Sequence, residues 1–337
     1  MNGFLRKRWF LLSLLIVIPS GLMLGASLQP ARIDTLTATL KPALLTGFVL
    51  FLMAFTLDSG QLVNSLRNPS PVLWAALVNV GLIPLVVWPL MVLFQAPPDF
   101  GFGLMIAASV PCSMAAVSVW TRIAGGNDAV SLLVTVVTNG LCFLFTPFWL
   151  NLTTTGSVQL DVGEMILRLA YTVLIPTFAA QALRQLPRPA AFATRHKIAI
   201  GVMAQSCVLV LVAVASCKAG ARLGENGSAV SIASTLAVWG ACIGVHLGAM
   251  AVGIAGAYTF GFSRVDRIAI TFASSQKTLP IGVYLATDPT MFGNPDLLGP
   301  GIGIPFAVFP ILMYHASQLF IDTVIADRLA AGGSKAR

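Results

Sequence analysis

A lysine lies in the middle of a stretch that is otherwise apolar enough to cross a membrane. The stretch runs from Ile268 to Ala286, and Lys277 belongs to a polar, proline-containing patch within it. A charged side chain at bilayer depth is costly, so it usually faces a cavity or a partner and not lipid. Lys277 is therefore a candidate functional residue whose ammonium could neutralise an anionic substrate or electronegative helix ends, or exchange a proton. The alternative is a structural lysine that snorkels, or that bridges to a carbonyl group or to Asp58.

A second polar interruption lies in the first half of the chain, between Ser109 and Ser118. Together with the patch around Lys277, it places one interrupted segment at a corresponding position in each half, which indicates the binding site of a secondary transporter. Each half-helix exposes unpaired backbone groups and a partial dipole charge at its inner end, so a break can hold an ion or a polar substrate. Pro111 and Pro280 are therefore predicted helix breaks. For the first of them, a simple proline kink is the alternative.

The composition identifies an integral membrane protein. The chain has 337 residues, of which 57% are hydrophobic and 9% are charged, whereas about a quarter of the residues of a soluble domain are charged. A spanning helix needs about 20 apolar residues. The sequence predicts ten such spans, at about residues 9–27, 43–58, 71–95, 102–122, 128–150, 165–184, 198–218, 229–258, 267–287 and 303–325.

The basic residues predict the orientation of these spans. The net charge is +8, but the charges lie at loop ends without a basic stripe or interleaved aromatic residues, so we expect no nucleic-acid partner. With both termini in the cytoplasm, cytoplasmic ends carry most Lys and Arg residues, as the positive-inside rule requires in a cell (inner or plasma) membrane. The predicted inside set is Arg6, Lys7, Arg8, Arg67, Arg122, Arg184, Arg188, Arg195, Lys197, Arg264, Arg267, Arg328, Lys335 and Arg337, against Arg32, Lys41, Lys218 and Arg222 outside.

Ten spans divide into two sets of five, and because five is odd the second set must enter the membrane from the opposite side. This is the condition for inverted repeats. The predicted repeats are residues 1–184 and 165–337, with the sixth span beginning near residue 165 and a basic, proline-rich loop from Arg184 to Lys197 at the junction. The first span could instead be a cleaved signal peptide, but its apolar run is long enough to span and the repeat count needs it.

Several stretches resemble one transporter family. They are Ser109–Ser113, Thr121–Ser131 and Ala273–Leu279, with the Gly126-Asn127 pair followed by Ser131 and Thr135 on one helix face. In these residues the chain resembles the bile acid:sodium symporter superfamily, and more closely its SBF-like branch. The resemblance implies an all-α fold of ten transmembrane helices. It also implies that discontinuous helices 4 and 9 cross in a core domain (about 71–150 and 229–325) beside a panel domain (about 9–58 and 165–218).

Relatives in that superfamily move organic anions, commonly with sodium, so the resemblance implies a secondary active transporter that works by alternating access. Of the family's sodium ligands, the hydroxyl residues Ser131 and Thr135 match, one turn apart, which suits a hard cation. The other ligand positions fall on Val117 and Ser118 in helix 4, Asn79 in helix 3, and Thr271, Ser274 and Ser275 in helix 9.

Thr271 stands where the family has the glutamate that carries the negative charge of its sodium site, and Lys277 is the charge nearby. At an effective dielectric constant of 20, a sodium ion about 5 Å from the ammonium would be repelled by about 3 kcal/mol. The sequence thus argues against the usual sodium coupling, and it leaves a sodium ion at Ser131 and Thr135 or a proton as alternative coupling ions. We expect no other cofactor.

The predicted site binds a coupling ion or the head group of a small, anionic substrate. Its residues are Asn79, Ser118, Ser131, Thr135, Thr271, Ser275, Gln276 and Lys277. A channel-like or regulatory membrane protein that affects ion homeostasis is the main rival. An intramembrane enzyme is a weaker one, because the sequence has neither a Gly-x-Ser-x-Gly nucleophile with a spaced histidine nor paired intramembrane aspartates.

The remaining ionisable residues are expected to have structural roles. His246 and His315 stand alone in their spans, which is typical of hydrogen bonds between helices, and a proton relay is the alternative. Asp58 and Asp322 are predicted near cytoplasmic helix ends, where they would be solvated, and not as coupling carboxylates. The five cysteines form no metal-ligand pattern, and buried apolar packing is expected for each.

Overall fold

The computed structural model describes residues 3–28, 32, 35, 40–57, 69–93, 98–114, 116–154, 160–226, 232–288 and 304–334. Every regular element in these ranges is a helix. Asp58, Arg67, Lys335 and Arg337, to which the sequence assigned positions, lie outside the described residues.

Seven of the described helices are long and apolar enough to cross a membrane, which confirms an all-α membrane protein. They correspond to α1 (Gly3–Ser27), α5 to α6 (Ser70–Leu93), α9 (Asp128–Thr154), α10 to α11 (Val162–Arg184), α13 (Lys197–Asn226), α14 (Ile232–Thr259) and α17 (Ile304–Ser334).

The other predicted spans are shorter pieces. The second is α3 (Pro42–Phe55), the fourth consists of α7 (Pro98–Ser109) and α8 (Val117–Ile123), and the ninth consists of α15 (Arg264–Ala273) and α16 (Leu279–Thr287). The arrangement of ten spans as two inverted repeats therefore remains a prediction.

Two of the long helices contain π-helical turns, and a proline follows each turn. The first turn, η1 (Val78–Leu82), lies between α5 (Ser70–Leu77) and α6 (Ile83–Leu93). There the backbone N–H of Ile83 donates to the carbonyl of Val78, and not to that of Asn79 as in an α-helix. The next residue, Pro84, has no N–H. The same turn, η2 (Ala170–Leu174), precedes Pro176 between α10 (Val162–Leu169) and α11 (Ile175–Arg184). Such turns leave backbone carbonyls free for other partners.

The two helix breaks have local causes. After α7 the last backbone bond runs from Val110 N to Ile106 O, and Pro111 can neither donate nor let its predecessor remain helical. In the second break, residues 274–278 separate α15 from α16. Pro280 lies in the first turn of α16, a position where its missing N–H costs nothing. It therefore starts a half-helix and is not inside the gap.

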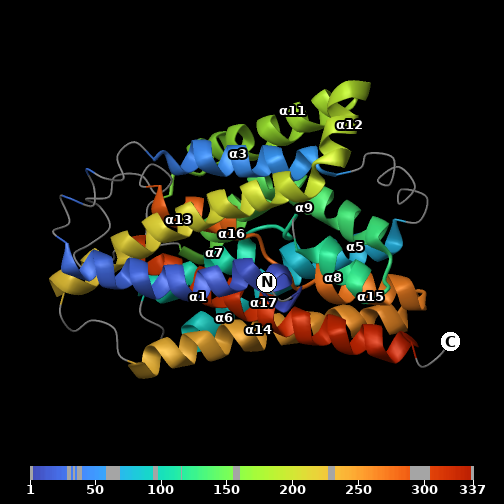
Figure 1. The fold of residues 1–337 in the computed structure, drawn as a ribbon. Helices are drawn as coiled ribbons and strands as arrows, with labels where there is room; N and C mark the ends of the chain where they lie inside the picture. Colours follow the sequence, from blue (N-terminus) through green and yellow to red (C-terminus); the bar gives the residue numbers. More distant parts are fainter. Residues whose placement is uncertain are drawn as a thin grey trace.

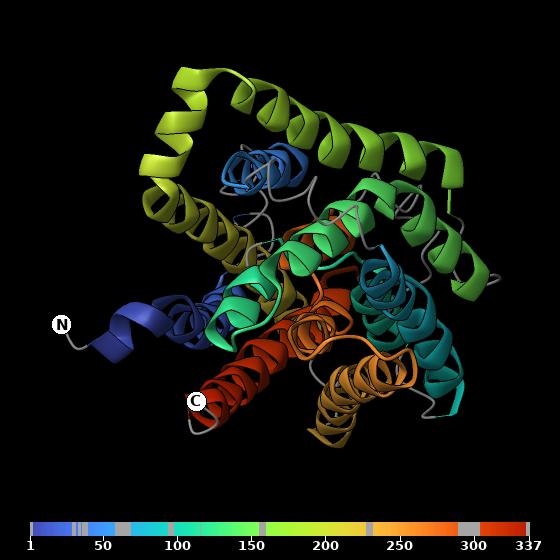
Figure 2. The same cartoon turned by 90° about the vertical axis from the view of Figure 1, so that its right-hand side faces the viewer.

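The helices form two groups (Figures 1 and 2). In one group α1 runs beside α13, while α11 and α13 flank α3. The close α1–α13 contact depends on small residues, since a Cβ on Gly220 would overlap the backbone of Leu22. In the other group α7 packs on α17, α14 packs on α15 and α17, and α9 contacts α5, α8 and α15.

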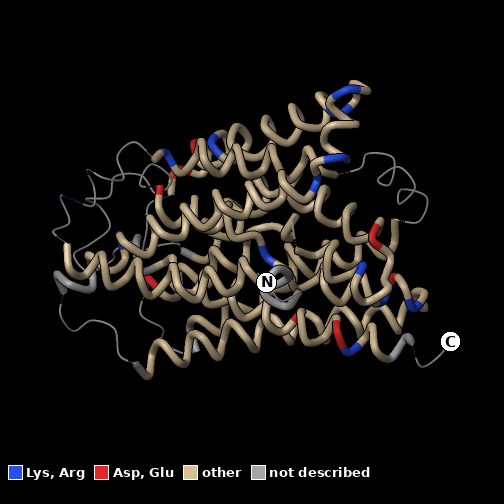
Figure 3. The backbone as a smooth tube through the Cα atoms, in the orientation of Figure 1, with Lys and Arg blue, Asp and Glu red and all other residues tan. Residues whose placement is uncertain are grey.

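The predicted junction loop contains a helix, α12 (Pro187–Arg195), which begins with a proline at its first turn. At its base, the Arg184 guanidinium donates to the carbonyl of Phe55 at 3.0 Å. Helix α12 lies at the same end of the bundle as α8, the start of α15 and the end of α17, on the right of Figure 1. Lys and Arg residues are frequent at this end in Figure 3 and sparse along the middle of the helices.

Candidate substrate and ion site

The two breaks touch each other. The backbone N–H of Thr278 donates to the carbonyl of Pro111 at 2.9 Å, which joins residues far apart in the sequence. From α3, the hydroxyl of Thr46 lies 3.4 Å from the carbonyl of Pro280. We call this meeting point, residues 110–114 and 274–278, the crossing.

Lys277 lies at the crossing and is 2% exposed. Its Nζ donates to three oxygens, the backbone carbonyl of Asn79 at 2.6 Å, the Oδ1 of Asn79 at 3.2 Å and the carbonyl of Val110 at 2.9 Å. The carbonyl of Asn79 is available because Ile83 bonds to Val78 instead and Pro84 has no N–H. Of the sequence alternatives, a bridge to carbonyl groups is therefore the geometry observed.

Asn79 supplies donors to the end of α15. Its Nδ2 donates to the carbonyls of Ala273 at 3.0 Å and Gln276 at 2.9 Å, and lies 3.4 Å from that of Ser274. Its Oδ1 accepts from Lys277, which fixes the direction of the amide. Carbonyls at the C-terminus of a helix carry a partial negative charge; the Asn79 amide satisfies those at the end of α15, and the Lys277 ammonium satisfies that of Val110, which follows α7.

Side chains from α17 hold the second break on its other side. Gln318 accepts from the Lys277 backbone N–H and donates to the Lys277 carbonyl, each at 2.8 Å. The hydroxyl of Tyr314 donates to the carbonyl of Ser275 at 2.9 Å. Neither residue was selected from the sequence, because polar residues in a spanning helix have no pattern that identifies their partners.

The predicted site residues fall into separate clusters. Asn79, Ser275, Gln276 and Lys277 meet at the crossing, while the hydroxyl of Thr271 donates to the Arg267 carbonyl within α15 at 2.8 Å. The other three predicted residues, Ser118, Ser131 and Thr135, lie at α8 and α9.

The α8–α9 cluster is bonded internally. Thr121 and Ser131 share a hydrogen bond at 2.6 Å, and Thr135 donates to the Ser131 carbonyl at 2.8 Å. Ser118 donates to Asp128, whose other oxygen lies 3.6 Å from Arg122. This carboxylate was not predicted as part of the site.

The residues at the ligand positions implied by the resemblance divide between the crossing and the α8–α9 cluster, and the atoms available in these two places differ. At the crossing, cationic and amide N–H groups point at the carbonyls that a sodium ion would need. Oxygen ligands are required for a hard cation, so the crossing does not fit sodium. The α8–α9 cluster does offer hydroxyl oxygens and the Asp128 carboxylate, which is paired with Arg122.

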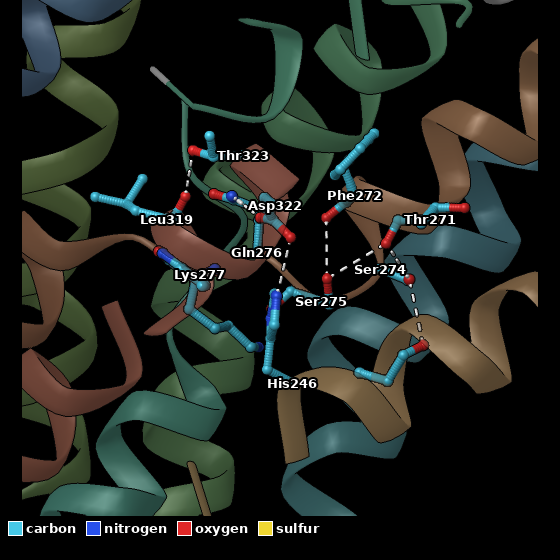
Figure 4. A network of polar contacts seen from close by, with 12 residues as sticks. His246, Thr271, Phe272, Ser274, Ser275, Gln276, Lys277, Leu319, Asp322 and Thr323 are labelled. Carbon is cyan, nitrogen blue, oxygen red and sulfur yellow. Dashed lines mark hydrogen bonds and ion pairs between the residues drawn. The ribbon is translucent and has the colours of Figure 1, made fainter. Parts of the chain in front are cut away.

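The structure contradicts the expectation for Asp322. It was predicted to be solvated near a helix end, but it is 0% exposed and its Oδ1 lies 3.0 Å from Nε2 of His246, also 0% exposed. Gln276 donates to the other Asp322 oxygen. Figure 4 shows these side chains beside Lys277. The rule that selected Lys277, an ionisable residue in an apolar span, would also have found this pair.

Two neighbouring cavities lie between the helix groups. The inner cavity, about 140 Å³, is lined by Ser113, Thr278 and Pro280 from the crossing region and by Met53 and Gln205 from α3 and α13. The outer cavity, about 210 Å³, also borders Met53 and Gln205 and extends to Arg122 and Lys197. Because the two cavities share Met53 and Gln205, together they form a path from the crossing toward the α12 end, and this path is lined mainly by apolar side chains. Lys277 is not among the residues that line either cavity.

Comparison with known proteins supports the same interpretation. Residues 8–331 match the model of the SBF-like CPA transporter family (DUF4137). The chain is 21% identical to sodium/bile acid cotransporter 7-B of Xenopus laevis over 335 residues, covering 96% of this chain and 92% of that protein. It is 25% identical to an uncharacterized protein of Pseudomonas aeruginosa over 296 residues, covering 84% and 82%.

A plant protein extends the set of relatives. The probable chloroplastic sodium/metabolite cotransporter BASS1 of Arabidopsis thaliana is 24% identical over 246 residues, 72% of this chain and 57% of that protein. These matches confirm the resemblance drawn from the residues of the predicted fourth, fifth and ninth spans. The chain belongs to the SBF-like CPA transporter family and is an integral membrane transporter of a small molecule.

Proposed function

We propose that the protein is a secondary active transporter that moves a small organic anion by alternating access. The moving parts are a panel of α1, α3 and α10 to α13 and a core of α5 to α9 and α14 to α17. Together they form ten spans in two inverted repeats. The support is that the fourth and ninth of these segments are the broken ones and that their breaks are hydrogen-bonded to each other.

The position of the cavities is the observation that carries the proposal. One wall of the inner cavity is the crossing, and the opposite wall comes from α1, α3 and α13. A solute there would contact both helix groups, so a relative movement of the groups would change the side from which it is reached. This is the arrangement expected for alternating access around a site near the middle of the membrane.

An anionic substrate fits the charges along this path. The outer cavity is bordered by Arg122 and Lys197, and the first turn of α16, through Leu279 and Pro280, borders the inner one. The N-terminus of a helix has a partial positive charge that favours anions.

Lys277 has a different part in this proposal from direct substrate contact. It acts as a resident cation that joins the carbonyls of Asn79 and Val110, at a place where sodium-coupled relatives would need an ion. The crossing therefore works without sodium.

We also propose that both termini face the cytoplasm of a cell membrane. The support is the frequency of Lys and Arg at the end of the bundle where α12 lies (Figure 3). This places the opening of the outer cavity, with Arg122 and Lys197, on the cytoplasmic side.

Exchange in proteoliposomes tests the transporter class. Vesicles loaded with unlabelled taurocholate, as a representative organic anion, should accumulate labelled taurocholate transiently. The reason is that alternating access couples the exit of unlabelled anion to the entry of labelled anion. A panel of smaller carboxylates and sulfonates should be run in parallel. Labelled anions that equilibrate without acceleration by the internal pool would indicate a channel and contradict the proposal.

The charge of the path can be tested with a matched pair of variants. Arg122→Gln should raise the half-saturating anion concentration severalfold, because it removes a cation that borders the outer cavity. Arg188→Gln makes the same charge change on the exposed helix α12 and should leave uptake unchanged. Equal effects of the two variants would indicate that uptake depends on the overall charge of the protein surface and not on a cation at the outer cavity.

A further inference from the structure

A buried imidazole–carboxylate pair lies directly behind the second break. His246 comes from α14 and Asp322 from α17, both are fully buried, and Nε2 and Oδ1 are 3.0 Å apart. A carboxylate removed from water is costly unless it is paired and hydrogen-bonded. The proposed function does not use this pair, although it contacts the crossing.

The imidazole lies between two oxygen acceptors. Its Nε2 faces Asp322 at 3.0 Å, and its Nδ1 faces the carbonyl of Ser275 at 3.4 Å. A neutral imidazole has a single N–H and can donate to one of the two. Both contacts become hydrogen bonds only when one more proton is present, either on the imidazole beside an ionised Asp322 or on Asp322 beside an Nδ1-protonated imidazole. The geometry therefore contains a place for one additional proton.

This place is connected to the crossing through two consecutive residues. Ser275 provides the carbonyl that His246 faces, and Gln276 donates through Nε2 to the second oxygen of Asp322. The other amide atom of Gln276, Oε1, is buried without a hydrogen-bond partner. Because Lys277 follows directly, a proton on the pair would alter the bonding of the break that holds the resident cation.

Several other titratable groups surround the pair. Lys277 belongs to the second break and Cys112 to the first break. Cys242 precedes His246 by one turn of α14, and from α17 the Tyr314 ring meets His246 edge to face at 5.8 Å between centroids. His315, also on α17, is bonded to Gln318.

The charges of Lys277 and Asp322 determine how one added proton changes the net charge at the crossing. An ammonium at Lys277 and a carboxylate at Asp322 carry opposite charges, while thiols and phenols carry none. With a neutral imidazole these charges cancel, and one added proton leaves a single positive charge. A monovalent anion in the adjoining cavity would cancel it, which is favourable where the dielectric constant is low.

We propose that His246, Asp322 and Gln276 form a proton-binding site that couples proton uptake to anion binding at the crossing, one proton for each monovalent anion. This inference rests on the proposed transport function and specifies its coupling ion. The proton enters from water on one side, is held between the ring nitrogen and the carboxylate, and leaves to water on the other side with the anion.

Nitrogen-15 NMR of histidine-labelled protein tests the proton site without any substrate. The chain has three histidines, and the signal of the exposed His196 is identified with His196→Gln, which leaves the core intact. We expect the His246 signal to change between neutral and protonated forms across the pH range in which the protein stays folded. A His246 signal that keeps one form throughout this range would overturn the proposal.

Two variants show whether the carboxylate belongs to the site. Asp322→Asn should abolish the His246 titration over the same range, whereas Asp327→Asn, which changes a carboxylate in the exposed part of α17, should preserve it. An unchanged titration in Asp322→Asn would contradict the proposed pair. If Asp322→Asn does not yield folded protein, Gln276→Glu adds a second carboxyl group at the site and should change the titration instead.

Proteoliposomes separate the proton site from the transport function. In the wild type, an inward proton gradient should drive taurocholate accumulation, while His246→Gln should lose this gradient-driven accumulation. A titrating His246 in a protein that exchanges no anion would contradict the transport proposal alone. Accumulation that responds to the gradient equally in the wild type and His246→Gln would overturn the coupling proposal alone.

Discussion

The two helix breaks meet at one point, yet different kinds of groups hold them. Neutral side chains of the neighbouring helix α9 hold the first break: Thr138 and Asn139 bind the backbone of Cys112, and Thr146 binds the carbonyl of Ser109. Asn79, Lys277 and three side chains of α14 and α17 hold the second.

This difference assigns separate roles to the two breaks. Apart from its bonds to Lys277 and Thr278 of the second break, the first is held by uncharged side chains of the single helix α9, which suits a scaffold that moves as part of the core. The second joins three other helices, contains Lys277 and lies beside the buried Asp322, so any change of charge at these residues is transmitted to it directly. We therefore expect substitutions at the second break to be more severe than equivalent substitutions at the first.

The largest effect is expected for Lys277→Ala. It leaves the buried carbonyls of Asn79 and Val110 without their donor, and each unsatisfied group costs about 1–3 kcal/mol. Transport should be lost and the thermal unfolding temperature in detergent should fall, while Lys41→Ala, at the exposed start of α3, should change neither.

The same variant offers a chemical rescue. Removal of the ammonium leaves an oxygen-lined space, so ethylamine or sodium should raise the unfolding temperature of Lys277→Ala and not that of the wild type. A variant as stable as the wild type, with no response to either cation, would show that the lysine is not a resident cation.

A matched pair of amides compares the breaks directly. Asn79→Ala removes a donor to the carbonyls of Ala273 and Gln276 and an acceptor for Lys277. Asn139→Ala removes a donor to the carbonyls of Cys112 and Thr135. We expect about 3 kcal/mol of destabilisation from the first variant and about 1–2 kcal/mol from the second. Chemical unfolding in detergent measures both, and the reverse order would contradict the assigned roles.

The smallest effect is expected for Thr146→Val, in which a methyl group replaces the hydroxyl that donates to the Ser109 carbonyl at 2.9 Å. The variant leaves one buried carbonyl of the first break unpaired and should cost about 1 kcal/mol. Anion exchange should be kept. Loss of exchange in a folded Thr146→Val protein would show that the first break is more than a scaffold.

The sequence was sufficient to predict the membrane class, the places of the interruptions and the family, because hydropathy, prolines and intramembrane charge leave local signals. It was not sufficient to predict how the site is assembled. The partnership of Lys277 with Asn79 depends on a π-turn that frees one carbonyl, and no periodicity reveals that turn before the structure is known.

The error over Asp322 has a related cause. Its position was inferred from the expected depth of a span, and α17 continues to Ser334, beyond the predicted end near residue 325. The carboxylate is therefore deeper in the protein than the span boundary implied. The placement of Ser118 and Ser131 in a separate cluster, which reaches the crossing through the contact of Thr135 with Cys112, could not be predicted either, since it depends on how α8 and α9 pack.

We propose that the ammonium of Lys277 takes the place of a coupling sodium ion at the crossing. The most direct test is the unfolding temperature of the purified wild-type protein in detergent, titrated with sodium chloride against choline chloride at equal ionic strength. We predict superimposable curves for the two salts. A saturable stabilisation specific to sodium in the wild type would contradict the account.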